Sequence, residues 1–295
     1  MKTYLDCIPC FFKQALEASR IAGADEETQR QVLNAVAGAL PDFPLEASPP
    51  EMGRIIYGLV VKHTGREDPY LEIKDRSNRL ALNMCDRLRR IVDQDHDRLL
   101  KAVELAIAGN IIDYGVNTAL DIDAELNRIL SAGRDTIRSE NQTFFNVDAF
   151  KEALAEARTI LYLADNAGET VFDRILLEEI KRIDREKEII YAVKEEPAIN
   201  DALEKDAIDC GIDRFAEVIS SGSDAPATVL PLCSDHFLDI YQRADMVISK
   251  GQGNFEGLSD TERPVFFLLM AKCPVIARDI GCRVGDIILL HHSSG

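Results

Sequence analysis

The chain has 295 residues, of which 46% are hydrophobic and 29% are charged. This balance is typical of globular proteins and excludes a disordered chain. Lys and Arg number 34 against 51 Asp and Glu, so the net charge is −17. Such a surface repels nucleic-acid phosphates and anionic lipids, so we expect neither a nucleic acid nor a membrane as a partner. A small anionic substrate is not excluded, provided that a metal ion or a few lysines create a local positive centre.

The length corresponds to about two domains at roughly 150 residues each. No apolar run approaches the roughly 20 residues of a membrane span, and residues Met1–Cys7 contain no signal-peptide core. We therefore expect a cytoplasmic protein. The seven cysteines are an odd number scattered along the chain, which favours free thiols over a disulfide framework.

The first half of the chain has the apolar spacing of helices. Helical patterns cover residues 5–22, 25–41, 69–93, 96–109 and 121–131, and a further one begins at Ser48. Pro49 and Pro50 follow Ser48, as expected for a cap with proline in the first turn. No convincing strand pattern precedes residue 150, so the sequence predicts an all-helical domain over residues 1–150.

The second half alternates short apolar runs with helical patterns. The predicted strands are Thr159–Leu163, Glu188–Val193, Ala216–Ile219, Met246–Ile248, Val265–Met270, Val275–Ala277 and Ile287–Leu290. Helical stretches are expected near 169–184, 198–210 and 235–243. This alternation predicts an α/β domain over residues 151–295, with a mainly parallel sheet flanked by helices and most of the metal and phosphate site.

Ligands of an open parallel sheet bind beyond the carboxyl ends of its strands. Asp165 and Asn166 follow the first predicted strand, and Asp201 lies beyond the second. They offer only oxygen ligands, which suits a hard cation such as Mg²⁺ or Mn²⁺. The alternative is that all three are ordinary residues of helix starts.

The next two strand ends are polar as well. Ser221-Gly222-Ser223 and Gly251-Gln252-Gly253 can turn backbone N–H groups toward an anion, and Lys250 adds a point charge. Metal, lysine and N–H donors at one place suit a phosphoryl group. Taken singly, Lys250 is also read as a solvated lysine, and the glycines as a turn.

Two further patterns lie in the helical half. Cys7-Ile8-Pro9-Cys10 is a redox pair, half of a metal site, or two small apolar side chains on one helix face. The segment Gly109–Gly115 is a helix end and turn, unless the helical domain folds over the sheet edge.

Together these segments resemble the damage-control phosphatases, the family first labelled domain of unknown function 89. The motifs are Gly109-Asn110-x-x-Asp113-x-Gly115, Asp165-Asn166-Ala167-Gly168-Glu169, Asn200-Asp201-Ala202, Ser221-Gly222-Ser223-Asp224 and Lys250-Gly251-x-Gly253-Asn254. The resemblance covers nearly the whole chain, and Cys7-x-x-Cys10 is similar to the microbial branch of the family. One departure is Ala227, where a glycine is expected after Asp224-Ala225-Pro226.

The resemblance implies a metal-dependent phosphatase that hydrolyses small phosphorylated metabolites, such as sugar phosphates or damaged phosphometabolites. The divalent ion (Mg²⁺, Mn²⁺, Co²⁺ or Ni²⁺) would be held by Asp165, Asn166 and Asp201. Catalysis would involve Asp165, Lys250 and Asn110. The implied substrate-binding residues are Asn110, Asp113, Glu169, Ser221, Ser223, Lys250 and Asn254.

Two other functions remain open from the sequence. One is methyl transfer from S-adenosylmethionine, because an acidic residue after a strand can bind a ribose. The other is a non-enzymatic metal- or redox-binding protein that uses Cys7 and Cys10. The sequence leaves the substrate, the preferred metal and the oligomeric state undetermined.

Overall fold

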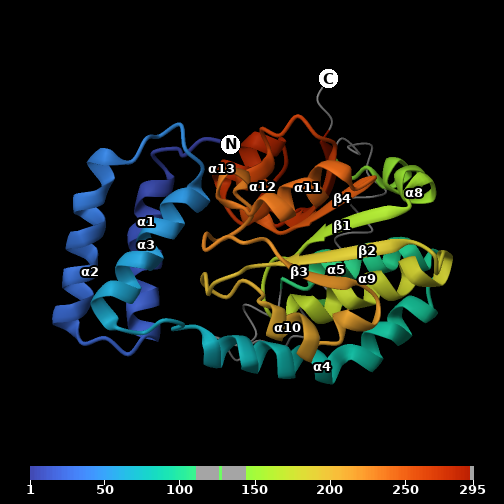
Figure 1. Ribbon diagram of the computed structural model, residues 1–295, viewed down its shortest axis with the longest axis horizontal. Coiled ribbons are helices and arrows are strands. Elements are labelled where there is room, and N and C mark those ends of the chain that lie inside the picture. The colour runs from blue at the N-terminus through green and yellow to red at the C-terminus, as the bar shows by residue number, and fades with distance from the viewer. Residues whose placement is uncertain (111–125, 128–143, 293–295) are drawn as a thin grey trace.

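The computed structural model describes residues 1–110, 126–127 and 144–292 (Figure 1). Its first three helices are α1 (Cys7–Ile21), α2 (Glu26–Ala39) and α3 (Pro49–Thr64). They stand apart from the sheet in Figure 1 and bury a core of their own around Phe11, Val36 and Ile56. At the start of α3, Ser48 and Glu51 form a capping box, and the prolines occupy the first turn as predicted.

The next helices belong to the sheet instead. α4 (Leu71–Asp93) and α5 (Arg98–Ala108) pack against α9 (Glu169–Ile183) and share its apolar core. α8 (Val147–Glu156) packs against the last strand. Within the described residues, α1, α2 and α3 thus have an apolar core separate from the one that α4 and α5 share with α9. The domain boundary expected at residue 150 stays a prediction. The helix expected over 121–131 lies outside the described residues, apart from its helical positions 126–127.

A six-stranded sheet forms the centre of the molecule. Its strands are β1 (Thr159–Leu163), β2 (Glu188–Val193), β3 (Glu217–Ser220), β4 (Met246–Lys250), β5 (Val265–Met270) and β6 (Ile287–His292). Their order is β3-β2-β1-β4-β5-β6, and every pair is parallel except β5–β6. The predicted fold class, α/β with a mainly parallel sheet, is confirmed.

The strand order alone predicts where a ligand site lies in the sheet. The chain runs outward from β1 to β3, and then returns to add β4 on the other side of β1. The order thus reverses between β1 and β4, which is where open α/β sheets leave a crevice at the carboxyl ends of their strands.

Helices cover both faces of the sheet. α4, α5 and α9 lie on one face, and α11 (Asp235–Arg243), α12 (Gln252–Leu258) and α13 (Pro274–Ile280) lie on the other. In β1, Ile160 and Tyr162 point into the first layer, whereas Leu161 and Leu163 point into the second. Burial on both faces explains why the strand is continuously apolar.

Two expected elements differ in the structure. The run Val275–Ala277, predicted as a strand, lies inside α13, and this prediction is wrong. Three apolar residues do not distinguish a strand from one buried helix turn, and Pro274 at the first position favours the helix. The helix expected over 198–210 begins only with α10 (Glu204–Asp209), because residues 200–203 form bridges to the loops after β1 and β2.

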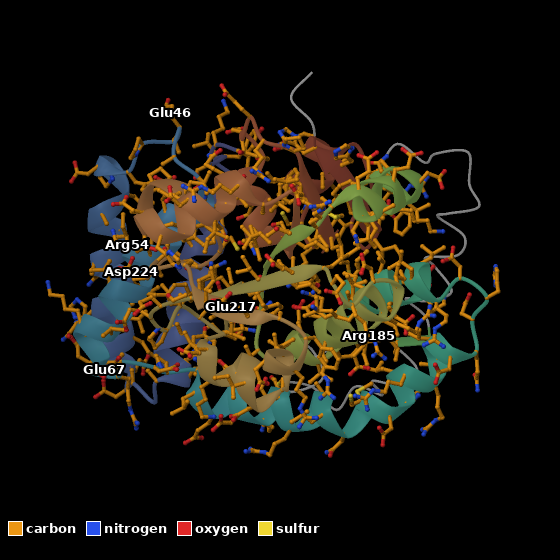
Figure 2. The ribbon with its side chains drawn as sticks, turned by 45° about the vertical axis from the view of Figure 1, so that its right-hand side comes forward. Glu46, Arg54, Glu67, Arg185, Glu217 and Asp224 are labelled. Carbon is orange, nitrogen blue, oxygen red and sulfur yellow. The ribbon has the colours of Figure 1, made fainter. Side chains whose placement is uncertain are left out.

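Direct contacts join the three N-terminal helices to the sheet. Arg54 of α3 donates from Nε to Asp224 Oδ1 at 2.6 Å, and Figure 2 shows the pair side by side. Gly53 lies so close to Pro226 that a β-carbon there would be 2.7 Å from the proline ring. These helices therefore lie over the sheet edge. None of the helices in the described residues is long and apolar enough to cross a membrane.

Candidate active site

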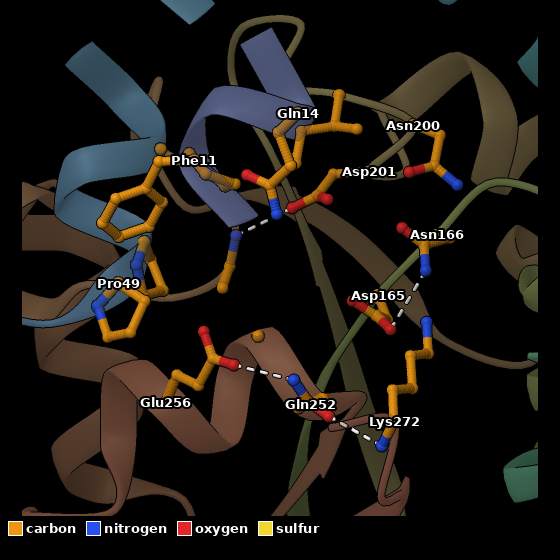
Figure 3. Close-up of a pocket in the computed structure, with 16 residues that line it drawn as sticks. Phe11, Gln14, Pro49, Asp165, Asn166, Asn200, Asp201, Gln252, Glu256 and Lys272 are labelled. Atoms are coloured by element: carbon orange, nitrogen blue, oxygen red, sulfur yellow. Dashed lines mark hydrogen bonds between the residues drawn. The ribbon is translucent and has the colours of Figure 1, made fainter. Parts of the chain in front are cut away.

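The loops after β1 and β2 are paired with each other at the sheet edge. The backbone N–H of Ala202 donates to the carbonyl of Asp165 at 2.8 Å, and Asn166 forms an antiparallel bridge with Asp201. The pairing brings Asp165, Asn166 and Asp201 to one place, although the two loops are far apart in sequence. Figure 3 shows their side chains around a common space.

That space is a cavity of about 230 Å³. Asp165, Asn166 and Asp201 line it from the sheet. The remaining lining residues are Phe11, Gln14, Pro49, Pro50, Gly53, Ile199, Asn200, Pro226, Ala227, Gln252, Gly253, Glu256 and Lys272. Five of these come from α1 and α3, so the N-terminal helices form a wall of the cavity.

The two aspartates place two carboxyl groups in a buried position, where negative charge is unfavourable. Burial raises the pKa of Asp165 well above its ordinary value, and the charges of Glu169 and Asp201 raise it further. Burial also raises the pKa of Asp201, which Lys194 at 3.9 Å opposes. Two buried carboxylates on one cavity are stabilised by a positive charge between them.

The chemistry of this donor set fits a hard divalent ion. Two carboxylates and the Asn166 amide supply oxygens only. In the described part of the chain, no group of three or more His, Cys, Asp or Glu is arranged to hold a metal. The set of two carboxylates and one amide therefore leaves several positions for water or substrate, as Mg²⁺ prefers.

Glu169, the first residue of α9, accepts hydrogen bonds from three of the predicted site residues. Its Oε1 accepts from Asn110 Nδ2 at 3.0 Å and from Asn166 Nδ2 at 2.9 Å. Its Oε2 accepts from Lys250 Nζ at 3.1 Å. Asn166 Nδ2 also donates to Asp165 Oδ2 at 3.1 Å, so the amide nitrogen of Asn166 is engaged by two carboxylates. A metal ligand from this side chain would therefore be its amide oxygen.

Lys250 lies in the layer beneath the cavity and is not among the residues that line it. Its ammonium group bonds Asp173 Oδ1 at 2.7 Å as well as Glu169. Burial lowers the pKa of Lys250, but the charges of Asp173 and Glu169 outweigh it and raise the pKa above its ordinary value. Lys250 is therefore a charged lysine that can act on the cavity through Glu169.

Asp173 is a buried partner of Lys250 that the sequence did not predict. It accepts hydrogen bonds from Tyr162 and Tyr191, both at 2.8 Å, besides that from Lys250. The available signal was its spacing, because residues four apart on a helix share a face and Asp173 follows Glu169 by four. Lys272 was missed as well, although it lies two residues beyond the end of β5 and lines the cavity.

Three other predicted substrate-binding residues, Asn254, Ser221 and Ser223, are buried and are not among the residues that line the cavity. Asn254 Nδ2 donates to the carbonyls of Ala164 and Lys250 at 2.9 and 2.7 Å, which ties the ends of β1 and β4 together. Ser221 and Ser223 are buried, and Ser223 Oγ accepts from the N–H of Ala225 at 3.1 Å. Asp113 lies outside the described residues. The functional roles of all four residues stay predictions.

Ala227 shows why a glycine is expected at its position. Its φ is +60°, in the left-handed region that favours glycine. The conformation lets its N–H donate to Asp201 Oδ2 at 2.8 Å while its carbonyl accepts from Lys194. The alanine thus keeps the turn and orients Asp201, at the cost of backbone strain.

Comparisons with known proteins show the family of the chain. A family model described as "Damage-control phosphatase ARMT1-like domain" matches residues 3–288. A damage-control phosphatase of Pyrococcus horikoshii is 33% identical over 99% of both chains, and one of Archaeoglobus fulgidus is 31% identical over 96% of both. An uncharacterized protein of Methanocaldococcus jannaschii is 35% identical, over 97% of this chain and 94% of its own.

The fold has a solved counterpart. A crystal structure of a domain of unknown function 89 family protein from Pyrococcus horikoshii superposes with a TM-score of 0.86, at 32% identity and 99% coverage of both chains. The chain therefore belongs to the ARMT1-like damage-control phosphatase family, as the sequence motifs predict.

Proposed function

We propose that this protein is a metal-dependent phosphomonoesterase that hydrolyses small phosphorylated metabolites, including sugar phosphates. The observation that carries the proposal is the pair Asp165 and Asp201, two buried carboxylates from neighbouring strand ends on one small cavity. Membership of a damage-control phosphatase family supports the reaction type. The cavity of about 230 Å³ suits a small substrate.

Asp165, Asp201 and the Asn166 oxygen would hold a divalent ion, namely Mg²⁺, Mn²⁺, Co²⁺ or Ni²⁺. Bound there, such an ion supplies charge neutralisation for a phosphoryl group and a more acidic water. The protein contributes the orientation of these oxygens: Glu169 fixes the amide of Asn166, and the Ala227 N–H fixes one oxygen of Asp201.

Lys272 is the positive side chain best placed to meet the phosphoryl oxygens. Figure 3 shows it extending toward Asp165 and Asn166 from across the cavity, and its charge lowers the pKa of Asp165. Lys250 contributes from beneath, by balancing the charge of Glu169 and Asp173. The two lysines thus oppose the surplus of carboxylates around the cavity, so that a dianionic phosphate can enter.

The test is phosphate release from a general chromogenic phosphate ester, with the divalent metal varied. We expect activity that requires a metal, is abolished by a chelator and returns on metal addition. Asp165→Asn and Asp201→Asn keep the side-chain shape and should each lower kcat by about a hundredfold or more, the size of effect that loss of one preorganised electrostatic contact produces.

A matched control is Asp209→Asn, which removes an exposed carboxylate on α10 far from the cavity and should leave the rate unchanged. Metal-independent turnover, or full activity of Asp165→Asn, contradicts the proposal.

A further inference from the structure

A second cavity of about 430 Å³ adjoins the first. The two cavities share five lining residues, which are Phe11, Gln14, Pro49, Gln252 and Glu256. The second cavity continues between α1 and the start of α13, past Cys7, Cys10 and Cys273, to Arg278. A phosphate ester with its phosphoryl group beside Asp165 can therefore extend its leaving group past this junction.

Glu256 is the ionisable residue among the five that form the junction. It lies on α12, and Gln252 Nε2 donates to its Oε1 at 2.8 Å. Gln252 is held in turn, because its Oε1 accepts from the N–H of Lys272 at 2.9 Å. Within the described residues, the Glu256 side chain accepts no second hydrogen bond, while its backbone carbonyl accepts from the amino group of Met1 at 2.9 Å. Glu256 lines both cavities. Figure 3 shows it pointing from α12 toward the space between Phe11 and Gln14.

The surroundings of Glu256 are poor in positive charge. Burial raises the pKa of Glu256, and the charges of Lys272 and of the Met1 amino group lower it. The Met1 amino group is itself paired with Asp260 at 3.1 Å, and the side-chain partner of Glu256 is the neutral Gln252. The thiols of Cys7, Cys10 and Cys273 face it from α1 and the start of α13, and burial raises the pKa of the Cys7 and Cys10 thiols, which keeps them uncharged. Arg278 lies at the far rim, with Asp6 at 3.9 Å. An anionic leaving group would thus be repelled by the Glu256 carboxylate, with little positive charge nearby to offset the repulsion.

We infer that Glu256 is a specificity-determining residue, which accepts a hydrogen bond from a hydroxyl of the leaving group and disfavours leaving groups that carry negative charge. The inference rests on the proposed function and extends it, because it concerns the alcohol part of the ester and not the phosphoryl group. Gln14 and Gln252, at the same junction, add neutral groups that suit hydroxyls.

The test compares two esters that differ only at the terminal carbon of the leaving group, which is neutral in one and anionic in the other. Glycerol 3-phosphate ends in a hydroxymethyl group, and 3-phosphoglycerate ends in a carboxylate. We define the selectivity as kcat/KM for the first divided by kcat/KM for the second, measured at pH 8. Glu256→Gln keeps the acceptor for Gln252 but removes the charge, and should lower the selectivity about tenfold, which corresponds to about 1.4 kcal/mol.

A second readout separates charge repulsion from a merely structural role. The wild-type selectivity should rise between pH 6 and pH 8 as Glu256 ionises, and Glu256→Gln should show a flat profile. Asp165 and Asp201 also border the first cavity, but they act on the phosphoryl group that both esters share, so their titration cancels in the ratio. Glu46→Gln, at an exposed position labelled in Figure 2, is the matched control and should leave the selectivity unchanged.

Each outcome bears on one proposal. An unchanged selectivity in Glu256→Gln overturns the role of Glu256, even if both esters are hydrolysed. If the wild-type protein hydrolyses neither ester, the selectivity is measured as the ratio of their Kd values by calorimetry. A loss of that selectivity in Glu256→Gln supports the binding role while the hydrolytic function fails. Binding of neither ester overturns the inference outright.

Discussion

Gly251 lies against the carboxylate of Asp165. A β-carbon on Gly251 would stand 1.8 Å from Asp165 Oδ2, far inside any allowed contact, and its φ of +83° is itself in the glycine region. The close approach places the turn between β4 and α12 directly on the carboxylate. The position thus needs glycine for two reasons, one conformational and one steric.

Gly251→Ala should therefore abolish phosphate release and lower stability, because Asp165 must move. Gly281→Ala is the matched control: its φ is +81°, but nothing lies within 4 Å of the added β-carbon. It should cost only the roughly 1–2 kcal/mol of a left-handed alanine and retain activity. Thermal unfolding and the phosphatase assay check both variants. Equal losses of activity in the two would contradict the steric reading.

Lys250→Met should destabilise the fold by about 3–5 kcal/mol, because it leaves the buried carboxylates of Glu169 and Asp173 uncompensated. The comparison is Lys205→Met, which removes an exposed ammonium group that pairs with Asp75 and Asp209. Exposed pairs contribute about 0–1 kcal/mol. Urea denaturation measures both, and similar losses would show that the buried network carries no special weight.

Ala227→Gly should raise stability or leave it unchanged, although glycine usually weakens a fold. At φ +60° the alanine is strained by about 1–2 kcal/mol, and glycine relieves this at the cost of greater freedom in the unfolded chain. Ala37→Gly, on the exposed side of α2, should cost about 1 kcal/mol. Chemical denaturation of the two variants decides the point, and a clear loss of stability in Ala227→Gly would show that its turn is unstrained.

Glu256 should make stability depend on pH. Burial raises its folded-state pKa from 4.5 to about 7. The native state therefore keeps a proton that the unfolded chain loses between these values, so stability falls as the pH rises from 4.5 to 7. Glu256→Gln should thus raise the melting temperature at pH 8 and change it little at pH 4. The gain at pH 8 is about 1–2 kcal/mol, less than the full shift implies because the side chain is partly solvent-accessible. A gain of equal size at both pH values would assign it to packing and not to charge.

Most of the fold could be predicted from local patterns. Strands buried on both faces appear as short continuous apolar runs, and β1, β2 and β5 begin and end where such runs do. The pattern failed at Val275–Ala277, because a run of three apolar residues is too short to show a strand or helix periodicity. In the structure this run lies inside a helix. The sequence also did not show that α1, α2 and α3 have a core separate from that of α4 and α5. The apolar spacing of α4 and α5 is the same whether they pack against other helices or against a sheet.

The candidate site was partly predictable for a related reason. Asp165, Asn166 and Asp201 follow strand ends, and parallel strands bring those ends to one edge, so a local rule was enough to group them. No local rule leads from Lys250 to Asp173, or places Glu256 on the same cavity as Gln14 of α1, because each pair comes from segments far apart in the chain.

Chain order and apolar periodicity thus specify which elements form and which loops share an edge, since both depend on neighbours within a few residues. Which side chains line the cavity and which are buried behind it depends on how α1, α3 and α9 pack against that edge. That packing is a balance of burial and charge over the whole molecule, and no single segment of the sequence contains it.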